Sequence, residues 1–206
     1  MLQDPQAVEE ASLKIIDQEV GSHSFNPGQW SVVRQAIYAT ADYDYARNMA
    51  FHPAAVEAGV AAIRFGADIV ADSQTVAVGI AKDRLRKHGG TVWCFISDED
   101  VVRKAKEKNL SRAAVSMRKA AETSDGSIYV IGNAPAALIE LIDLVKEGKA
   151  KPSLIIGVPV GFIDAAGSKE ALLGLSTPFI TCRGPKGGSP VAAAIVNALT
   201  LLAVQS

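Results

Sequence analysis

The stretch Ser127-Ile-Tyr-Val-Ile131, followed directly by Gly132-Asn-Ala-Pro135, decides the fold of this chain. A short apolar, β-branched run leads into a Gly/Pro loop, and the loop leads into a helix-like segment. Similar blocks occur at Leu154–Phe162 and Arg183–Pro190. Nearly continuous apolar strands that alternate with helices are typical of a parallel sheet covered on both faces.

Outward from these blocks, strands and helices are expected to alternate. The predicted strands are Ala67–Ala71, Thr91–Ile96, Ser127–Ile131, Ser153–Val158 and Pro178–Cys182. The predicted helices are Ser73–Lys87, Asp98–Glu122, Ala136–Lys146, Asp164–Leu173 and Pro190–Val204. This alternation predicts an α/β fold of three layers, α/β/α, in which helices cover both faces of a mainly parallel sheet of about five strands. The crossovers between its parallel strands are expected to be right-handed.

The first 66 residues have a different pattern. They look entirely helical, roughly at 7–20, 28–37, 42–50 and 53–65. No Pro/Ser-rich linker separates them from the first predicted strand, so we expect a helical N-terminal layer (1–66) on a strand–helix core (67–206). The whole chain, 1–206, is then one domain.

Composition excludes several function classes. The chain has 206 residues, with 21 basic and 22 acidic side chains and a net charge of −1. A balanced charge argues against nucleic-acid and membrane-surface partners. No apolar run approaches the roughly 20 residues that span a bilayer, and residues 1–5 do not resemble a secretory leader. Cys94 and Cys182 stand far apart in strand-like runs, which favours buried thiols in a reducing, cytoplasmic setting.

The loops after the strands are candidates for binding an anionic ligand. In open α/β sheets the ligand lies at the carboxyl ends of the strands, where backbone N–H groups and helix N-termini attract negative charge. Ordinary strand–helix turns are the alternative for any one of these loops. The residues that we expect to bind substrate there are Gln74, Asn133, Gly187, Gly188 and Ser189.

Known catalytic fingerprints do not fit the chain. It has no Gly-x-Gly-x-x-Gly, no P-loop spacing and no Gly-x-Ser-x-Gly elbow. His23, His52 and His88 stand alone, so no metal site is expected. The remaining pattern favours a polyanionic ligand whose reaction needs orientation and proton placement more than covalent chemistry.

Several blocks together resemble one family, the precorrin-8X methylmutases of corrin-ring biosynthesis. The similarity runs over nearly the whole chain, and Gly132-Asn-Ala-Pro135 with Pro159-Val-Gly-Phe162 is highly specific. The resemblance implies an isomerase that moves a methyl group from C11 to C12 of a corrin precursor, giving hydrogenobyrinate or, with cobalt, cobyrinate. It also implies a homodimer that needs no cofactor of its own. A tetrapyrrole-binding carrier without turnover is the alternative.

The resemblance also implies roles for single residues. Tyr38 occupies the position of the family histidine that is taken as proton donor or acceptor, so Tyr38 is the expected catalytic residue. Gln35 stands where the family often has a substrate-contacting arginine, and Ser12 and Arg112 match substrate-contacting residues. Three interpretations of Tyr38 stay open: its phenol donates a hydrogen bond to the ring, it only packs against the ring while another group supplies the proton, or the chain binds without turnover.

The N-terminal layer is rich in aromatic side chains. A broad macrocycle needs a cover on the face that one sheet edge leaves open, and a two-fold dimer could supply it. We therefore expect the aromatic groups of this layer to form an interface that walls the pocket, with ordinary core packing as the alternative. The residues concerned are Trp30, Tyr38, Tyr43, Tyr45 and Phe51.

Overall fold

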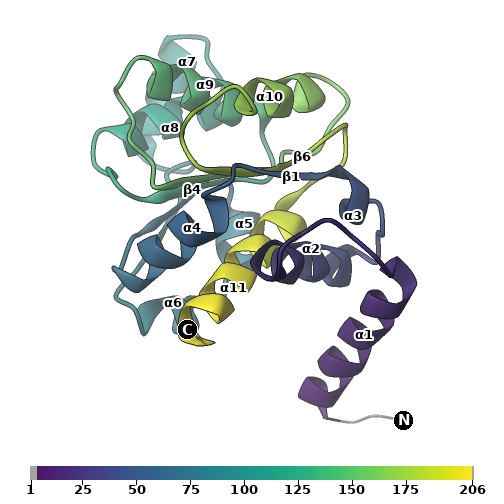
Figure 1. The fold of residues 1–206 in the computed structure, drawn as a ribbon. Helices are drawn as coiled ribbons and strands as arrows, with labels where there is room; N and C mark the ends of the chain where they lie inside the picture. Colours follow the sequence, from purple (N-terminus) through teal and green to yellow (C-terminus); the bar gives the residue numbers. More distant parts are fainter. Residues whose placement is uncertain (1–3, 206) are drawn as a thin grey trace.

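The computed structural model describes residues 4–205. Residues 1–3 and 206 lie outside the described part, which therefore includes neither end of the expected domain 1–206 nor most of residues 1–5. One sheet runs through the molecule, with helices above and below it (Figure 1). The predicted α/β fold with helices on both sheet faces is confirmed.

The sheet has six strands in the order β1-β6-β5-β4-β2-β3. Five of them are parallel, and β1 pairs antiparallel with β6 at one edge. The carboxyl ends of β2, β4, β5 and β6 form one edge of the sheet, here called the carboxyl rim. The strands are β1 (Met49–Phe51), β2 (Ile69–Ala71), β3 (Val92–Trp93), β4 (Ile128–Ile131), β5 (Leu154–Gly157) and β6 (Phe179–Cys182).

The central strands are buried on both faces, as their apolar runs predict. In β4, Ile128 and Val130 pack into the core on one face, while Tyr129 and Ile131 pack into the core on the other. Successive side chains of a strand point to opposite faces, so a strand covered on both sides has no polar position. The continuous apolar runs are thus explained by the two helical layers.

The helices divide between the two faces. On one face, α11 packs against α2, α4 and α5, and α1 packs on α2; α7, α8, α9 and α10 cover the other face (Figure 1). The first-face helices are α1 (Pro5–Val20), α2 (Pro27–Thr40), α3 (Tyr45–Asn48), α4 (Ala55–Arg64), α5 (Gln74–Gly79), α6 (Lys82–Arg86) and α11 (Ser189–Gln205). The second-face helices are α7 (Glu99–Glu107), α8 (Arg112–Ala121), α9 (Pro135–Lys146) and α10 (Ala165–Leu172).

The expectation that the first 66 residues are entirely helical is wrong at one place. The helix expected at 42–50 shrinks to α3, and β1 follows it because Met49 finds a partner in Cys182 on the free edge of β6. This pairing is non-local, so local helical propensity could not reveal it.

Smaller differences concern element lengths. The helix predicted at 73–87 splits into α5 and α6 around Ile80, and the one at 98–122 breaks near Asn109, whose φ is 50°. The strand predicted at 91–96 keeps two residues, and Cys94 is half-buried rather than buried. Both cysteines are free thiols, and Cys182 is buried as expected.

Candidate functional site

The first loop of the carboxyl rim, Gly132–Ala134, already holds a carboxylate. Asp72 follows β2 directly, is fully buried, and accepts hydrogen bonds from the N–H groups of Gly132 (3.1 Å), Asn133 (2.8 Å) and Ala134 (2.8 Å). Burial raises the pKa of Asp72, and the three N–H donors oppose that rise. The backbone groups that we expected to meet an anionic ligand are therefore used within the chain. Only the exposed side chain of Asn133 is left for a substrate.

Close packing at Gly132 brings three parts of the rim together. A Cβ atom at this position would lie 2.8 Å from Val76, 2.7 Å from Ala192 and 3.1 Å from the Cα atom of Ser189. The absence of a side chain thus lets the starts of α5 and α11 approach the end of β4. Ser189 and the start of α5, where Gln74 lies, are therefore close to the loop that contains Asn133.

The second loop, residues 183–189, is held against β5. Gly187 has a φ of 153°, and a side chain there would collide with the carbonyl oxygen of Val158. The N–H group of Gly188 donates to that carbonyl (2.8 Å), so it is not available to a ligand. Within the described residues, the N–H groups of Gly187 and Ser189 have no hydrogen-bond partner. These two donors remain free at the start of α11.

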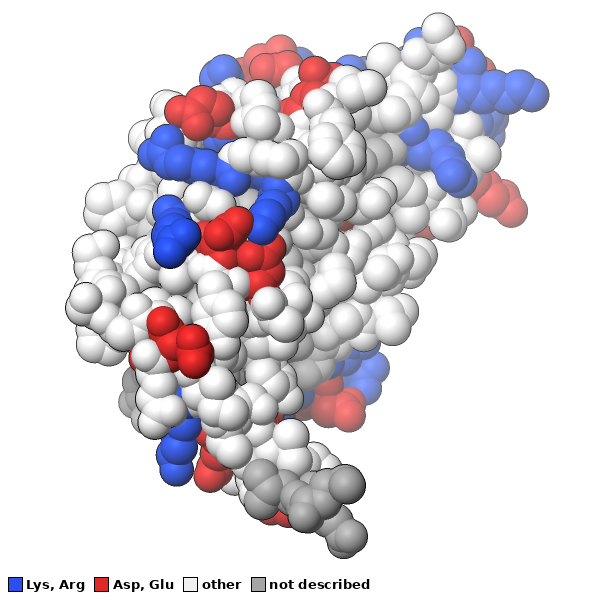
Figure 2. Space-filling model, turned by 90° about the vertical axis from the view of Figure 1, so that its right-hand side faces the viewer, with Lys and Arg blue, Asp and Glu red and all other residues white. Residues whose placement is uncertain are grey.

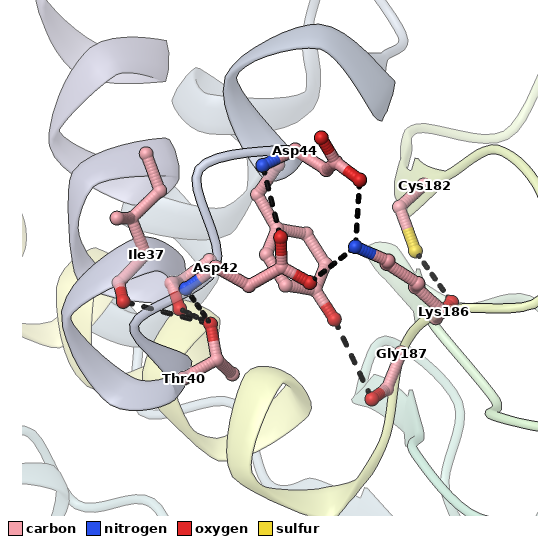
Figure 3. A network of polar contacts seen from close by, with 9 residues as sticks. Ile37, Thr40, Asp42, Asp44, Cys182, Lys186 and Gly187 are labelled. Atoms are coloured by element: carbon pink, nitrogen blue, oxygen red, sulfur yellow. Dashed lines mark hydrogen bonds and ion pairs between the residues drawn. The ribbon is translucent and has the colours of Figure 1, made fainter. Parts of the chain in front are cut away.

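Lys186 of this loop is fixed at both ends (Figure 3). Its ammonium group pairs with Asp42 and Asp44, each at 2.6 Å. Its carbonyl oxygen accepts hydrogen bonds from the Nζ atom of Lys169 (2.5 Å) and the Sγ atom of Cys182 (3.1 Å). Burial lowers the pKa of Lys169 and raises that of Cys182, so desolvation disfavours the charged form of each.

Tyr45 completes this network from the other side. Its hydroxyl lies 3.5 Å from the carbonyl oxygen of Gly187 and donates toward it. Burial raises the pKa of Tyr45 above the ordinary range of a phenol, which keeps the hydroxyl protonated. The second loop is therefore supported by α3 as well as by α10 and β6.

Tyr38 and Ser12 are brought together, as the resemblance implies. They line one hollow of about 290 Å³ between α1 and α2. The hollow is mainly apolar; its other lining residues are Ile15, Ile16, Ile37, Ala41 and Tyr43. The Tyr38 side chain is exposed, and its hydroxyl has no hydrogen-bond partner among residues 4–205. That hydroxyl is therefore able to meet a ligand.

Gln35 and Arg112 lie apart from this hollow. Gln35 donates to Glu9 (3.2 Å) and lines a different, polar hollow of about 570 Å³ with Glu9, Arg34 and Arg84. Arg112 is the first residue of α8, and its exposed side chain contacts none of the other candidate residues in the described structure.

Sequence reasoning missed an exposed apolar segment at the rim. In the loop after β5, Phe162 is 99% exposed and Ile163 is 81% exposed, and Val160 is partly exposed beside Gly188. The segment is tied to the second loop, because the N–H of Gly161 donates to the carbonyl of Pro185 (3.1 Å). Its signal in the sequence was an apolar run that continues past the predicted strand end into a glycine loop.

The side of the molecule that carries α1 and α3 shows how charge is distributed near the site (Figure 2). Basic and acidic side chains lie next to one another in one part of this surface, and much of the surface beside them is uncharged. The ion pairs of the second loop are those of Lys186 with Asp42 and Asp44 and the pair Arg183–Glu170 (3.7 Å). This side of the molecule thus combines an uncharged area with neighbouring groups of opposite charge.

Other kinds of site find no support in the described part of the chain. No group of three or more His, Cys, Asp or Glu side chains among these residues could hold a metal ion. No described helix is long and apolar enough to cross a membrane.

Comparison with known proteins decides the family. The sequence family described as Precorrin-8X methylmutase matches residues 7–202. The chain belongs to the precorrin-8X methylmutase family. The cobalt-precorrin-8 methylmutase of Priestia megaterium is 52% identical over 97% of this chain and 88% of its own length. The precorrin-8X methylmutase of Pseudomonas aeruginosa is 38% identical over 96% of each chain.

A solved structure supports the same assignment. The precorrin-8x methyl mutase from Thermus Thermophilus superposes with a TM-score of 0.91, at 41% identity and 96% coverage of both chains. The family predicted from the sequence is thereby confirmed, together with its fold and its class, the methylmutase isomerases of cobalamin biosynthesis.

Proposed function

We propose that this chain catalyses migration of the methyl group from C11 to C12 of precorrin-8X or cobalt-precorrin-8. The observation that carries the proposal is the match over residues 7–202 to a family whose relatives bear both names. A methyl shift within the substrate transfers no group to the protein. This agrees with a site that offers hydrogen-bond donors and apolar surface rather than an activated nucleophile.

The two kinds of surface at the site fit the two parts of such a substrate. The peripheral carboxylates of the precursor meet the free N–H groups of Gly187 and Ser189 and the side chains of Gln74, Asn133 and Arg112. The ring lies against the apolar hollow that Tyr38 and Ser12 line. Gly188 contributes by holding the second loop in place, since its N–H donates to the carbonyl of Val158. Gln35 contacts the substrate while its side-chain amide is held by Glu9.

Tyr38 is the proposed catalytic residue. Its free hydroxyl donates a hydrogen bond to a ring nitrogen beside the migrating methyl group. A phenol is a weaker acid than an imidazolium, so it polarises the ring less than the family histidine would. The chain therefore retains turnover at reduced efficiency.

A homodimer in the cytoplasm completes the proposal. Ile15, Tyr38 and Tyr43 leave apolar surface exposed around the hollow, and a second copy would cover it. Of the five aromatic residues expected at this interface, Tyr45 is buried in the core, while Trp30 and Phe51 pack against it. Of these five aromatic residues, Tyr38 and Tyr43 remain as candidates for the dimer interface, so the proposed interface is smaller than the sequence suggested.

The test is conversion of the purified precursor, with and without cobalt, followed by absorption as the methyl group moves. Tyr38→Phe should lower turnover by about 10²-fold, the low end of general acid–base contributions. Tyr38→His should restore it and make the rate depend on pH near neutrality. Equal rates for the three proteins would remove Tyr38 from the chemistry, and a wild type that binds without conversion would refute the isomerase function.

Two further predictions accompany this test, one on precursor binding and one on the oligomeric state. Arg112→Ala should weaken precursor binding by about 10- to 100-fold without altering the unfolding midpoint, since the side chain is exposed. Light scattering at micromolar concentration should give the mass of a dimer. A monomer that binds precursor as tightly as a dimer would contradict the shared pocket.

A further inference from the structure

We propose that Lys186 is a positioning residue of the reaction. It fixes the helix end that carries Tyr38 relative to the loop that carries Gly187 and Ser189. This inference rests on the proposed function, because it assumes that both parts contact one substrate. Lys186 itself reacts with nothing, and its role is to hold the two contacting parts at one separation.

The first step is the connection from Lys186 to α2. Asp42 pairs with the ammonium group (2.6 Å), and its own N–H donates to the hydroxyl of Thr40 (3.3 Å). The Thr40 hydroxyl donates in turn to the carbonyl of Ala36 (2.8 Å). These bonds join Asp42 to the last turn of α2, which contains Tyr38. Figure 3 shows this path from Ile37 and Thr40 to Lys186.

The two aspartates act together. Asp44 pairs with the same ammonium group (2.6 Å), and its N–H donates to the carboxylate of Asp42 (3.0 Å). The turn after α2 is therefore closed by hydrogen bonds of its own, with Ala41 in the left-handed region at φ 53°. Because this turn is held by its own hydrogen bonds, we expect a shift of Lys186 to move the end of α2 rather than only to deform the turn.

The second step is the connection from Lys186 to the rim. Lys169 and Cys182 hold its carbonyl group, and the next two residues are pressed onto the end of β5. The backbone of the loop is thus rigid on the sheet side. The Lys186 side chain is one of three polar links from this loop to the α2–α3 region. The Tyr45 hydroxyl contact is long (3.5 Å), and the N–H of Arg183 donates to the carbonyl of Asn48 (2.8 Å) where the loop begins; both of these reach α3. The link made by Lys186 is the one that reaches the turn after α2. Loss of the lysine should let α2 and the rim move relative to each other.

Stability is a poor explanation for this ion pair. The Lys186 side chain is 42% exposed, and exposed pairs contribute little to folding because water and salt screen them. The reaction rate depends more strongly on where the contacting groups lie. A displacement of about 1 Å between reacting groups can cost about 10²-fold in rate.

The chain contains a matched control. Lys119 also bridges two aspartates, Asp98 and Asp100, at 2.6 Å each. This bridge joins α7 to α8 on the other face of the sheet, at the opposite end of α8 from Arg112. Both bridges consist of one lysine between two aspartates. A difference in activity between variants of Lys186 and Lys119 would therefore come from where each bridge lies in the fold.

The experiment compares Lys186→Met, Lys186→Arg and Lys119→Met with the wild type. We expect Lys186→Met to lower kcat by about 10- to 100-fold with a smaller change in KM, and Lys186→Arg to keep most of the activity. Lys119→Met should keep kcat within about 2-fold of the wild type. Both Met variants should shift the urea midpoint of unfolding by similar amounts. Equal kcat values for the two Met variants would overturn the inference.

Hydrogen exchange provides a readout that does not require turnover. Lys186→Met should speed amide exchange in both residues 36–44 and residues 183–189, and Lys119→Met should not. Unchanged exchange in either segment would overturn the positioning role even in an active enzyme. A wild type without turnover would instead refute the proposed function, and the exchange data would still decide whether Lys186 couples the two segments.

Discussion

The two glycine loops of the carboxyl rim look alike in sequence, but they differ in whether their backbone N–H groups are bonded within the chain. Gly132–Ala134 donates three N–H groups to the buried carboxylate of Asp72. In the loop 183–189, the carbonyl of Lys186 accepts from Lys169, and the N–H groups of Gly187 and Ser189 have no hydrogen-bond partner among residues 4–205. A loop before a helix N-terminus therefore binds an anion only if the chain does not supply one. The first loop is structural, and the second is the one that can meet a substrate.

Removing the internal anion should have the largest effect. Asp72→Ala leaves three N–H groups without an acceptor, and unsatisfied buried donors cost about 1–3 kcal/mol each. We expect a loss of about 3 kcal/mol or more in the free energy of unfolding, measured in urea. Asp72→Asn keeps one acceptor oxygen and should lose less.

The control for this variant lies at the other end of β2. Asp68 precedes β2 and accepts hydrogen bonds from the N–H of Thr91 (2.8 Å) and the indole of Trp93 (2.9 Å) at an exposed position. Asp68→Ala should cost about 1 kcal/mol. Equal losses for Asp72→Ala and Asp68→Ala would show that the buried carboxylate does not hold the first loop.

Breaking the second loop should have the next largest effect. In Gly187→Ala the new methyl group meets the carbonyl of Val158 in a backbone conformation that side chains rarely adopt. We expect a loss of about 2 kcal/mol in unfolding free energy and weaker precursor binding. Gly184→Ala, with a φ of 78° and open space around its Cβ, is the control and should cost about 1 kcal/mol. Both are measured by urea unfolding, and a milder effect at 187 than at 184 would contradict the packing.

A third variant tests whether the exposed apolar segment after β5, which contains Phe162, contacts the ligand. Phe162→Ala should raise KM for the precursor by about 10-fold or more, because burying a phenylalanine contributes about 1.5–3 kcal/mol. Phe65 is 91% exposed at the end of α4, before β2 begins, so it lies away from the carboxyl rim. Phe65→Ala should leave KM unchanged in the same steady-state assay. If both variants behave alike, or if Phe162→Ala only separates a dimer, the segment is not a ligand contact.

The smallest expected effect concerns pH. The hydrogen bond from Lys186 lowers the pKa of Asp42 below its usual 3.8. Since the folded-state pKa lies below the unfolded one, the pair stabilises the fold above about pH 4 and loses this contribution as the pH falls through the folded value. The urea midpoint of the wild type should exceed that of Asp42→Asn at pH 7, and the difference should shrink as the pH falls below the usual pKa of 3.8. A constant difference would exclude the ionised pair as its cause.

Much of the fold was predictable because its signals are local. The apolar runs at β4, β5 and β6 are long enough to mark buried strands, and Pro135 marks the first turn of α9, as observed. Strand β1 escaped prediction, because three residues after a short helix carry no signal until the edge of β6 is present to pair with them. The break between α7 and α8 was also missed: Asn109 adopts the left-handed region there, and Ser111 caps the start of α8.

The site was predictable in part. The sequence grouped Gln74, Asn133 and Ser189 on one rim, since residues that follow parallel strands must share an edge. It paired Ser12 with Tyr38 only through the family resemblance, because nothing local connects two helices. It could not separate Gln35 from Tyr38, which lie on one helix three residues apart and face different hollows.

The sequence by itself determined the family and the layered α/β fold, and it pointed to the carboxyl rim as the candidate site, because these follow from patterns of neighbouring residues. Only the tertiary structure decided which glycine loop is available. Asp72 lies 60 or more positions before the N–H groups it satisfies, and Lys169 lies 17 positions before the carbonyl it binds. Such long-range contacts depend on how strands and helices pack, so a loop's composition cannot reveal whether its hydrogen-bonding groups are already in use.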